Sequence, residues 1–415
     1  MLSALDAKIK QYLVVTGNYW AFTLTDGALR MLVVLYFHQL GYSALNIALL
    51  FLFYEFFGVV TNLIGGWLGA RVGLNRTMQV GLVLQVGALL MLTVPESMLS
   101  IVWVMSAQAL SGIAKDLNKM SAKSSIKHLV PNDSQGRLYQ WVAILTGSKN
   151  TLKGAGFFLG AILLQWYGFS LSMWIMASAL AVTALLSAFV LQADMGKAST
   201  KPKFKDIFSK SEAINRLSLA RMFLFGARDI WFVVALPVYL STALGWQPSF
   251  VGAFMATWII AYGFVQTLAP KLTQRQKTRP STLSPAVRWG ALLTLNTAIV
   301  AALFHFFEYN LASVEIILVL GLISFGFCFA VNSSLHSYLI VALAKSDGVS
   351  LDVGFYYMAN AMGRLVGTML SGYLYQVYGL WVCLMGSTLM LLIATITVHF
   401  VPQPNIAPQH KPIKH

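Results

Sequence analysis

Apolar side chains follow one another in long runs along this chain, and polar residues gather in short segments between the runs. A transmembrane helix needs about 20 predominantly apolar residues. Twelve runs approach or exceed that length: residues 12–37, 45–68, 78–94, 99–117, 138–166, 171–191, 217–240, 251–269, 289–307, 316–343, 354–377 and 381–401. A helix satisfies its own backbone hydrogen bonds in lipid, whereas a membrane barrel would show short alternating strands. The pattern therefore predicts an all-α polytopic membrane protein with twelve transmembrane helices.

The positive charges are unevenly distributed among the polar connections. Six connections contain no lysine or arginine: residues 38–44, 95–98, 167–170, 241–250, 308–315 and 378–380. The alternate connections and the two ends hold most of the remaining cations, from Lys8 and Lys10 through Lys345 to Lys411 and Lys414. Cytoplasmic loops of membrane proteins carry an excess of Lys and Arg. Both termini are therefore predicted to be cytoplasmic.

The composition excludes the common soluble classes. Of the 415 residues, 57% are hydrophobic and 10% are charged, whereas soluble domains average about 45–50% and 25%. The net charge is +15, from 29 Lys and Arg against 14 Asp and Glu. The first run is too long for a secretory signal and carries Asp26 and Arg30. Cys328 and Cys383 fall inside predicted spans, where we expect reduced, buried thiols rather than a disulfide or a metal site.

The chain contains an internal repeat. Its longest polar connection divides the runs six and six, which predicts an N-terminal half (1–193), a cytoplasmic central loop (194–215), a C-terminal half (216–401) and a cytoplasmic tail (402–415). Two offsets, each joining a segment to the sixth one after it, support parallel halves. At an offset of 211 residues Lys153 matches Arg364, Gly156 matches Gly367 and Gly168 matches Gly379, and at an offset of 203 Asp26 matches Asp229.

Six plus six helices, parallel repeats and a basic central loop resemble the major facilitator superfamily. The loop after the second helix, GWLGARVGLNR (66–76), has the glycines and basic residues of that superfamily's cytoplasmic signature, but Ala70 stands where the signature has an acid. The fifth segment has Gly154, Gly156 and Gly160 of an antiporter-type motif without its proline. The resemblance implies a carrier that works by alternating access, with segments 1, 4, 7 and 10 around a cavity and segments 2, 5, 8 and 11 beside them.

Charged residues within the spans suggest what such a cavity would hold. A charge at the bilayer centre costs on the order of 3 kcal/mol, so these side chains should face the interior. We count seven cations against four acids, an excess of three that would bind an anion. The cations are Arg30, Lys115, Lys119, Lys149, Lys153, Arg228 and Arg364, and the acids are Asp26, Glu55, Asp116 and Asp229.

Lys149, Lys153 and Arg364 are the strongest candidates for substrate contact, because none has an acid on its own helix. Lys149 and Lys153 share one helix face, and the repeat could aim Lys153 and Arg364 at the midplane from opposite halves. For the other candidates, Arg30, Lys115, Lys119 and Arg228, simpler roles than substrate contact are also open.

Each alternative is an ion pair or a solvated position. Asp26 and Arg30, four residues apart, could neutralise each other, and Asp116 could pair with Lys115 or Lys119. Arg228 and Asp229 are adjacent and are expected to find partners elsewhere. Lys123 and Lys127 are expected to form a solvated or headgroup-facing stripe.

Proton coupling has four candidates: Asp26, Glu55, Asp229 and His336. A desolvated carboxylate can change its protonation near neutral pH. His336 has the alternative of an ordinary hydrogen-bonded interior histidine. Asn18, Tyr19 and Trp20 could contact a substrate, although aromatic packing also explains them. The sequence shows no catalytic constellation, metal cluster or cofactor motif, and we expect neither an enzyme nor a nucleic-acid-binding protein. Anionic lipid explains the basic loops.

Four stretches resemble a narrower group, the organoarsenical efflux permease family of bacterial arsenic-resistance operons (ArsJ). They are residues 12–43, 111–131, 145–158 and 224–240. The resemblance implies export of 1-arseno-3-phosphoglycerate across the bacterial inner membrane, conferring arsenate resistance, with a partner glyceraldehyde-3-phosphate dehydrogenase supplying this substrate. A monomer is expected. The alternatives are a facilitator or proton-coupled exporter of another organophosphate or drug-like organic anion, and a non-transporting membrane receptor or embedded enzyme.

Overall fold

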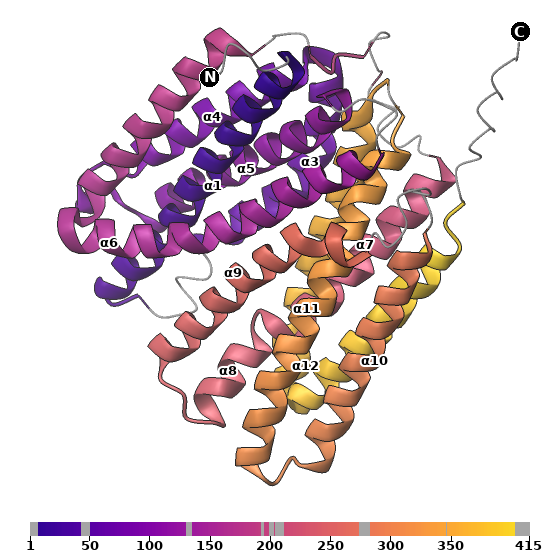
Figure 1. The fold of residues 1–415 in the computed structure, drawn as a ribbon. Helices are drawn as coiled ribbons and strands as arrows, with labels where there is room; N and C mark the ends of the chain where they lie inside the picture. The colour runs from indigo at the N-terminus through magenta and orange to yellow at the C-terminus, as the bar shows by residue number, and fades with distance from the viewer. Residues whose placement is uncertain are drawn as a thin grey trace, which may run out of the picture.

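The protein is built from long helices that pack side by side in two bundles (Figure 1). The computed structural model describes residues 7–42, 50–129, 135–191, 195–198, 203, 211–273, 283–345 and 347–402. All regular secondary structure within these ranges is helical. The twelve-helix, all-α fold predicted from the apolar runs is confirmed.

The first bundle comprises α1 (Ala7–Gln39), α3 (Leu52–Val72), α4 (Leu74–Met91), α5 (Ile101–Leu129) and α6 (Gln135–Val190), with a short 3₁₀ turn η2 (Glu96–Met98). The second comprises α7 (Glu212–Phe232), α8 (Ala235–Thr242), α9 (Pro248–Thr273), α10 (Ser284–Phe306), α11 (Leu311–Leu343) and α12 (Val349–His399). Most of the predicted central loop (199–202 and 204–210) and the tail from residue 403 onward lie outside the described residues.

Helices α6 and α12 are each a hairpin of two transmembrane segments. Their 56 and 51 residues are interrupted at Gly168 (φ 70°, ψ −178°) and Gly379 (φ 80°, ψ −177°). A positive φ is accessible to glycine without the Cβ clash that other residues meet. The two glycines are related by the 211-residue offset, so both halves turn back at the same position and in the same conformation. This geometry supports the repeat that the sequence indicates.

The count of membrane segments agrees with the sequence prediction. Seven helical stretches of the described chain are long and apolar enough to cross a membrane. Two of them are the hairpins α6 and α12, so the seven contain nine segments, and α3, α4 and α5 complete the twelve.

Two segments differ from the prediction. The apolar run that forms α5 ends at residue 117, yet the helix continues to Leu129, because its lysines face the protein interior instead of ending the span. The seventh segment is broken at Val233 and Val234, between α7 and α8. Pro237 cannot donate a backbone hydrogen bond to the carbonyl of Val233, which explains why the helix is interrupted there.

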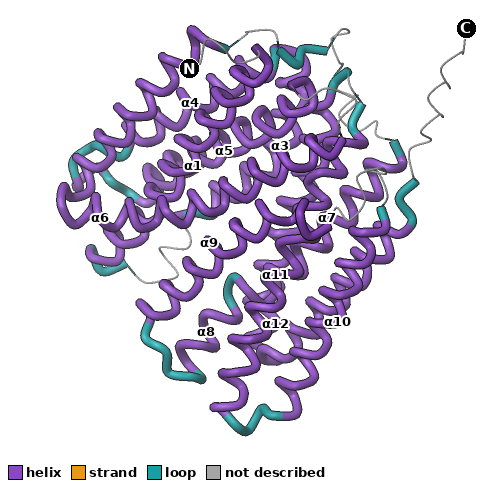
Figure 2. The backbone as a smooth tube through the Cα atoms, viewed as in Figure 1, coloured by secondary structure: helices purple, strands orange, loops and turns teal. Residues whose placement is uncertain are grey.

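The two bundles share a core at one end only. At the end that holds both described chain termini, one cluster of buried apolar residues combines the start of α1 and the ends of α5 and α11 with the starts of α6, α7 and α12. At the opposite end each bundle has a separate core of its own. The tube view shows the bundles diverging toward that end (Figure 2). The molecule is therefore closed at the terminal end, between α3 and α12 among other contacts.

Glycines allow the closed end to pack backbone against backbone. A Cβ on Gly354 of α12 would lie 2.5 Å from the carbonyl oxygen of Asn62 and 2.8 Å from the Cα of Gly66, both on α3. The hydroxyl of Ser350 donates a hydrogen bond of 2.8 Å to the carbonyl of Gly66. Because the opposing atoms are backbone, a larger residue at Gly354 has no side chain to displace.

We expect Gly354→Val to force α3 and α12 apart and to shift the protein toward a conformation open at the terminal end. Spin labels on cysteines replacing the exposed Arg71 and Lys345 would report a longer distance than in the parent protein. Gly372→Val, on the same helix with no atom within 4 Å of its Cβ position, is the matched control and should leave the distance unchanged. An unchanged distance in Gly354→Val would contradict the proposed closure.

Candidate functional site: a cation-lined central cavity

A cavity of about 300 Å³ lies between the two bundles. It is lined by α1, α3, α5 and α6 from the first bundle and by α7, α9, α11 and α12 from the second. These helices contain segments 1, 2, 4 and 5 and segments 7, 8, 10 and 11, which the superfamily resemblance predicts around a substrate. The lining includes nine cationic side chains: Arg30, Lys115, Lys119, Lys123, Lys149, Lys153, Arg221, Arg228 and Arg364.

Glu55 joins cations from three other helices. Its carboxylate lies 2.9 Å from the guanidinium of Arg30, 4.0 Å from the ammonium of Lys115 and 3.5 Å from the guanidinium of Arg364. Arg30 and Lys115 belong to the same bundle as Glu55, and Arg364 belongs to the other. The Glu55–Arg364 pair is therefore an electrostatic link between the bundles.

Asp229 is buried and pairs with two arginines. Its carboxylate lies 2.5 Å from Arg228 and 3.1 Å from Arg364. The expectation that Arg228 and Asp229 would find partners elsewhere is wrong for Arg228. Its long side chain bends back along the helix surface, so adjacent residues can meet although their Cα–Cβ bonds diverge.

The two carboxylates nearest the first bundle's lysines differ in their partners. Asp116 lies 2.5 Å from Lys119 and 3.8 Å from Lys115, as the sequence suggested. Asp26 accepts a hydrogen bond of 2.6 Å from the hydroxyl of Tyr54. It forms no ion pair with Arg30 in the described chain, because Arg30 is bound to Glu55 instead. The alternative of an Asp26–Arg30 pair is therefore replaced by the pair of Arg30 with Glu55.

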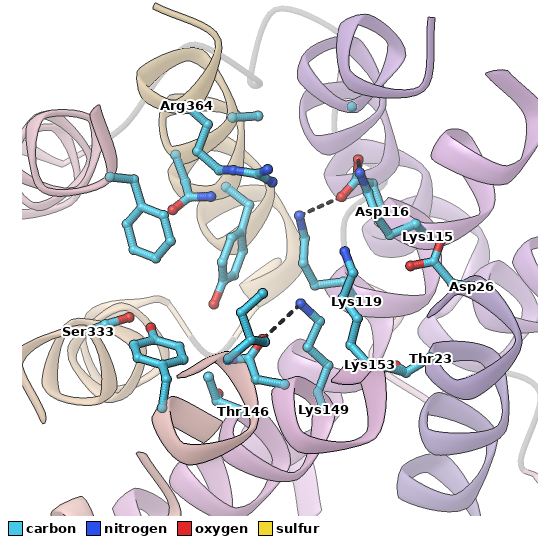
Figure 3. Close-up of a pocket in the computed structure, with 18 of the residues that line it drawn as sticks. Thr23, Asp26, Lys115, Asp116, Lys119, Thr146, Lys149, Lys153, Ser333 and Arg364 are labelled. Carbon is cyan, nitrogen blue, oxygen red and sulfur yellow. Dashed lines mark hydrogen bonds and ion pairs between the residues drawn. The ribbon is translucent and has the colours of Figure 1, made fainter. Parts of the chain in front are cut away.

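Lys149 and Lys153 extend from α6 toward the centre of the cavity (Figure 3). Neither has a carboxylate within ion-pairing distance among the described residues. The Lys149 ammonium instead donates a hydrogen bond of 3.2 Å to the side-chain carbonyl of Asn150. Arg364 points into the same space from α12 but is held by Glu55 and Asp229. Of the three strongest candidates, only the two lysines keep an unbalanced charge.

The expected solvated stripe at Lys123 and Lys127 is wrong. Lys123 is 4% exposed, lines the cavity and donates a hydrogen bond of 2.5 Å to the hydroxyl of Tyr357. Lys127 is half-buried and donates to the backbone carbonyls of Ala342 and Ala344 at the end of α11. Lys115, Lys119, Lys123 and Lys127 follow one another at four-residue intervals and so lie along one side of α5. Where α5 reaches the closed end, this side faces the second bundle.

Arg221 is a site residue that the sequence analysis missed. It lies inside the predicted seventh span, so counting every cation within the spans would have found it. Its side chain is 3% exposed and donates to the side chain of Asn360 (3.0 Å) and to the backbone and side-chain oxygens of Ser333 (3.1 and 3.2 Å). Its guanidinium also stacks over the ring of Phe225, 4.0 Å from the centroid.

The remaining candidates lie at or near the cavity without a clear ligand geometry. Tyr19 lines it, whereas Trp20 bonds to Ser148 and Asn18 contacts the sulfur of Met78. His336 is 1% exposed and is not part of the lining, and its Nδ1 has no hydrogen-bond partner in the described chain. Cys328 and Cys383 are free, buried thiols.

The charge balance of the site favours anions. Nine cations line the cavity, and four carboxylates accompany them when the buried Asp229 is counted with Asp26, Glu55 and Asp116. The formal excess is five positive charges, two more than the sequence count, because Arg221 and Lys123 join the set. In a partly dehydrated cavity such an excess attracts anionic ligands and repels cations.

Two helical bundles around a polar cavity that is closed at one end define a membrane carrier. The family model of the Major Facilitator Superfamily matches residues 15–284 and again 217–414, and the chain belongs to this superfamily of transporters. No curated protein sequence matches the chain.

Solved structures with the same fold include transporters that are named for different substrates. A bacterial homologue of the iron transporter ferroportin in an outward-facing state has a TM-score of 0.73 at 14% identity, over 95% of this chain and 99% of that one. The human organic anion transporter MFSD10 (TETRAN) gives 0.73 at 14%, over 95% and 100%. The transporter FucP in its outward conformation gives 0.74 at 11%, over 96% and 100%. At these identities the similarity establishes the fold alone.

We expect Glu55→Gln to destabilise the protein, because it leaves Arg30 and Arg364 without their shared carboxylate. Removing one partner of a fully buried pair costs about 3–5 kcal/mol, but Glu55 is 33% exposed, so a loss on the order of 1 kcal/mol and a lower Tm are expected. The double variant Glu55→Gln/Arg364→Gln should recover part of that loss in a double-mutant cycle. Glu212→Gln, which removes an exposed pair with Arg216, is the control. Strictly additive effects would show that the link between the bundles contributes nothing.

Proposed function

We propose that the protein exports an organic anion with two oxyanion ends from the cytoplasm, specifically 1-arseno-3-phosphoglycerate, by alternating access. The observation that carries this proposal is the excess of positive charge in the central cavity, above all the pair Lys149 and Lys153, which has no carboxylate partner among the described residues. A substrate bearing both a phosphate and an acyl arsenate would supply the missing negative charge.

The ArsJ resemblance falls on the same part of the molecule. The described residues of 12–43, 111–131, 145–158 and 224–240 fall mainly on α1, α5, α6 and α7–α8, four of the helical regions around the cavity. They contain seven of the nine cavity cations, leaving out only Arg221 and Arg364. A resemblance concentrated on these helices supports a shared substrate more than a resemblance spread over lipid-facing surfaces would.

The chemistry of the cavity suits an arsenate ester. Arsenate and phosphate groups are hard oxyanions, which Arg and Lys bind by charge and hydrogen bonds. Trivalent arsenic would instead prefer thiolates, and neither Cys328 nor Cys383 lines the cavity. A glyceraldehyde-3-phosphate dehydrogenase in the same cell would make the substrate from arsenate and the triose phosphate.

The orientation expected for the chain indicates which side of the membrane each end of the molecule faces. With both termini in the cytoplasm of a bacterial cell, the closed end is the cytoplasmic end, and the bundles diverge toward the outside. Export would then require a second conformation in which the contacts between α3 and α12 separate. Asp26 is our candidate for proton coupling, because it is the cavity carboxylate with no cation in ion-pairing distance among the described residues. We propose that the unit of transport is a monomer.

A second candidate is transport of another organophosphate or organic anion, since the cations would attract any such ligand. The fold similarity to a human organic anion transporter is compatible with it. Metal or neutral sugar cargo is a poorer match, because the excess of cations repels metal ions and gives no advantage to an uncharged ligand. The described residues also contain no cluster of three His, Cys, Asp or Glu side chains suited to a metal.

The proposal is tested by arsenate resistance in a sensitive bacterial host that co-expresses the dehydrogenase. Lys153→Ala and Arg364→Ala should each abolish resistance and reduce arsenate release from loaded cells by at least about 10-fold, because each removes a charged contact of roughly 1.5–3 kcal/mol. Lys271→Ala, an exposed lysine on α9 outside the cavity, should behave like the parent.

Membrane expression of each variant must equal that of the parent. Normal resistance in both cavity variants would contradict a central anion site. A parent protein that gives no resistance, but transports another phosphorylated anion in proteoliposomes, would favour the second candidate.

A further inference from the structure

The cavity cations divide into two sets. Arg30, Lys115, Lys119, Arg228 and Arg364 are paired with Glu55, Asp116 or Asp229. Lys123, Lys149, Lys153 and Arg221 have no carboxylate within 4.0 Å in the described part of the chain. The second set has two members on α6, one on α5 and one on α7.

Lys123 and Arg221 form a pair that spans the two bundles. Lys123 donates to Tyr357, and Arg221 donates to Asn360, which lies three residues further along the same helix, α12. Both side chains are almost completely buried, at 4% and 3% exposure, and both line the cavity. The Lys123 ammonium donates a hydrogen bond to the hydroxyl of Tyr357. The same ammonium lies over the ring of Tyr357, 4.8 Å from its centroid. Two buried cations that reach the same turn of α12, with no carboxylate partner in the described part of the chain, create a positive potential there.

The partners of Arg221 fix its orientation without neutralising it. Its Nε and Nη1 donate to neutral oxygens of Asn360 and Ser333. Its Nη2 has no hydrogen-bond partner among the described residues. Protein oxygens thus hold the guanidinium through Nε and Nη1, and Nη2 remains available to donate a hydrogen bond to an oxyanion.

A chain of uncharged groups connects Arg221 to Lys149 of α6. Lys149 donates to Asn150, and the amide of Asn150 donates to Gln266 across the bundle interface (2.5 Å). Gln266 donates in turn to the hydroxyl of Ser333, 3.3 Å away, which also receives the hydrogen bond from Arg221. Three neutral side chains therefore lie between Lys149 and Arg221, and four hydrogen bonds join the two cations through them.

We propose that Lys123 and Arg221 form a second oxyanion subsite, distinct from the subsite of Lys149 and Lys153, and that a substrate with a phosphoryl-type group at each end occupies both. This inference deepens the proposed function and rests on it. Lys123 and Tyr357 lie on opposite bundles at the closed end, so a ligand in this subsite contacts both halves where they must separate. The subsite thereby selects for substrates with two anionic ends over substrates with one.

The experiment measures binding to the purified full-length protein in detergent. The probes are propane-1,3-diyl bisphosphate, which has two phosphate ends, and inorganic phosphate, which has one. The parent should bind the bisphosphate more tightly by roughly 10- to 100-fold, because the second end adds charge-assisted hydrogen bonds. Arg221→Gln and Lys123→Gln should each remove most of this preference while changing phosphate affinity by less than about 3-fold, since the lysines of α6 still bind it.

The controls separate loss of the subsite from loss of the fold. Arg216→Gln, on the same helix as Arg221 and outside the cavity lining, should keep the full preference. Arg221→Lys retains the charge without the planar donor edge and should give an intermediate preference. Size-exclusion profile and Tm show whether each variant is folded. If Arg221→Gln does not fold, Lys123→Gln alone decides the outcome.

A full bisphosphate preference in folded Lys123→Gln would overturn the subsite, and so would a parent that binds both probes equally. The two proposals fail differently. A parent that prefers the bisphosphate but exports no arsenate retains the subsite and loses the proposed substrate. A parent that exports arsenate without any preference retains the substrate and loses the subsite.

Discussion

The burial of positive charge is the constraint on which the rest of the structure depends. A bare cation costs much free energy in a low-dielectric interior, and this chain places nine around one cavity. The carboxylates Glu55, Asp116 and Asp229 neutralise part of that charge, and their pairs connect α1, α3, α5, α7 and α12. The same ion pairs that hold the helices together leave four of the cavity cations without a carboxylate partner among the described residues. The same set of charged side chains thus contributes both to stability and to anion recognition.

The arrangement of the apolar cores fits the movement that the proposed transport requires. In the proposed transport cycle, a joint apolar core at the terminal end and two separate cores at the other would let the bundles pivot about the cavity. The pivot passes close to the residues that bind charge, because Glu55 with Arg364, and Lys123 with Tyr357, both reach across it. A ligand that changes the balance among these contacts therefore changes the relative free energies of the two conformations.

Much of the fold could be predicted from the sequence, because hydropathy and the distribution of Lys and Arg report directly on lipid burial. Ten of the eleven candidate site residues line the cavity or, in the case of Asp229, pair with a residue that does, whereas His336 lies apart from it. The pairing of Asp116 with Lys115 and Lys119 could be predicted because they share a helix. The pairing of Arg30 with Glu55 could not, since the two residues meet only once α1 and α3 are packed. The inward position of Lys123 was missed for a similar reason, because its partner Tyr357 is 234 residues away.

The glycine turns at Gly168 and Gly379 have a mechanical consequence. Each joins two long apolar helices with no loop between them, so in the proposed transport cycle a hairpin would move as one stiff lever instead of two independent rods. Residues at the closed end of α6 and α12 are therefore rigidly coupled to the outer surface of each bundle. Tilting of these levers against α1 and α7, on which Gly156 and Gly367 pack closely, would carry displacement across the full thickness of the bilayer. An insertion at either turn would uncouple that motion while leaving every cavity residue in place.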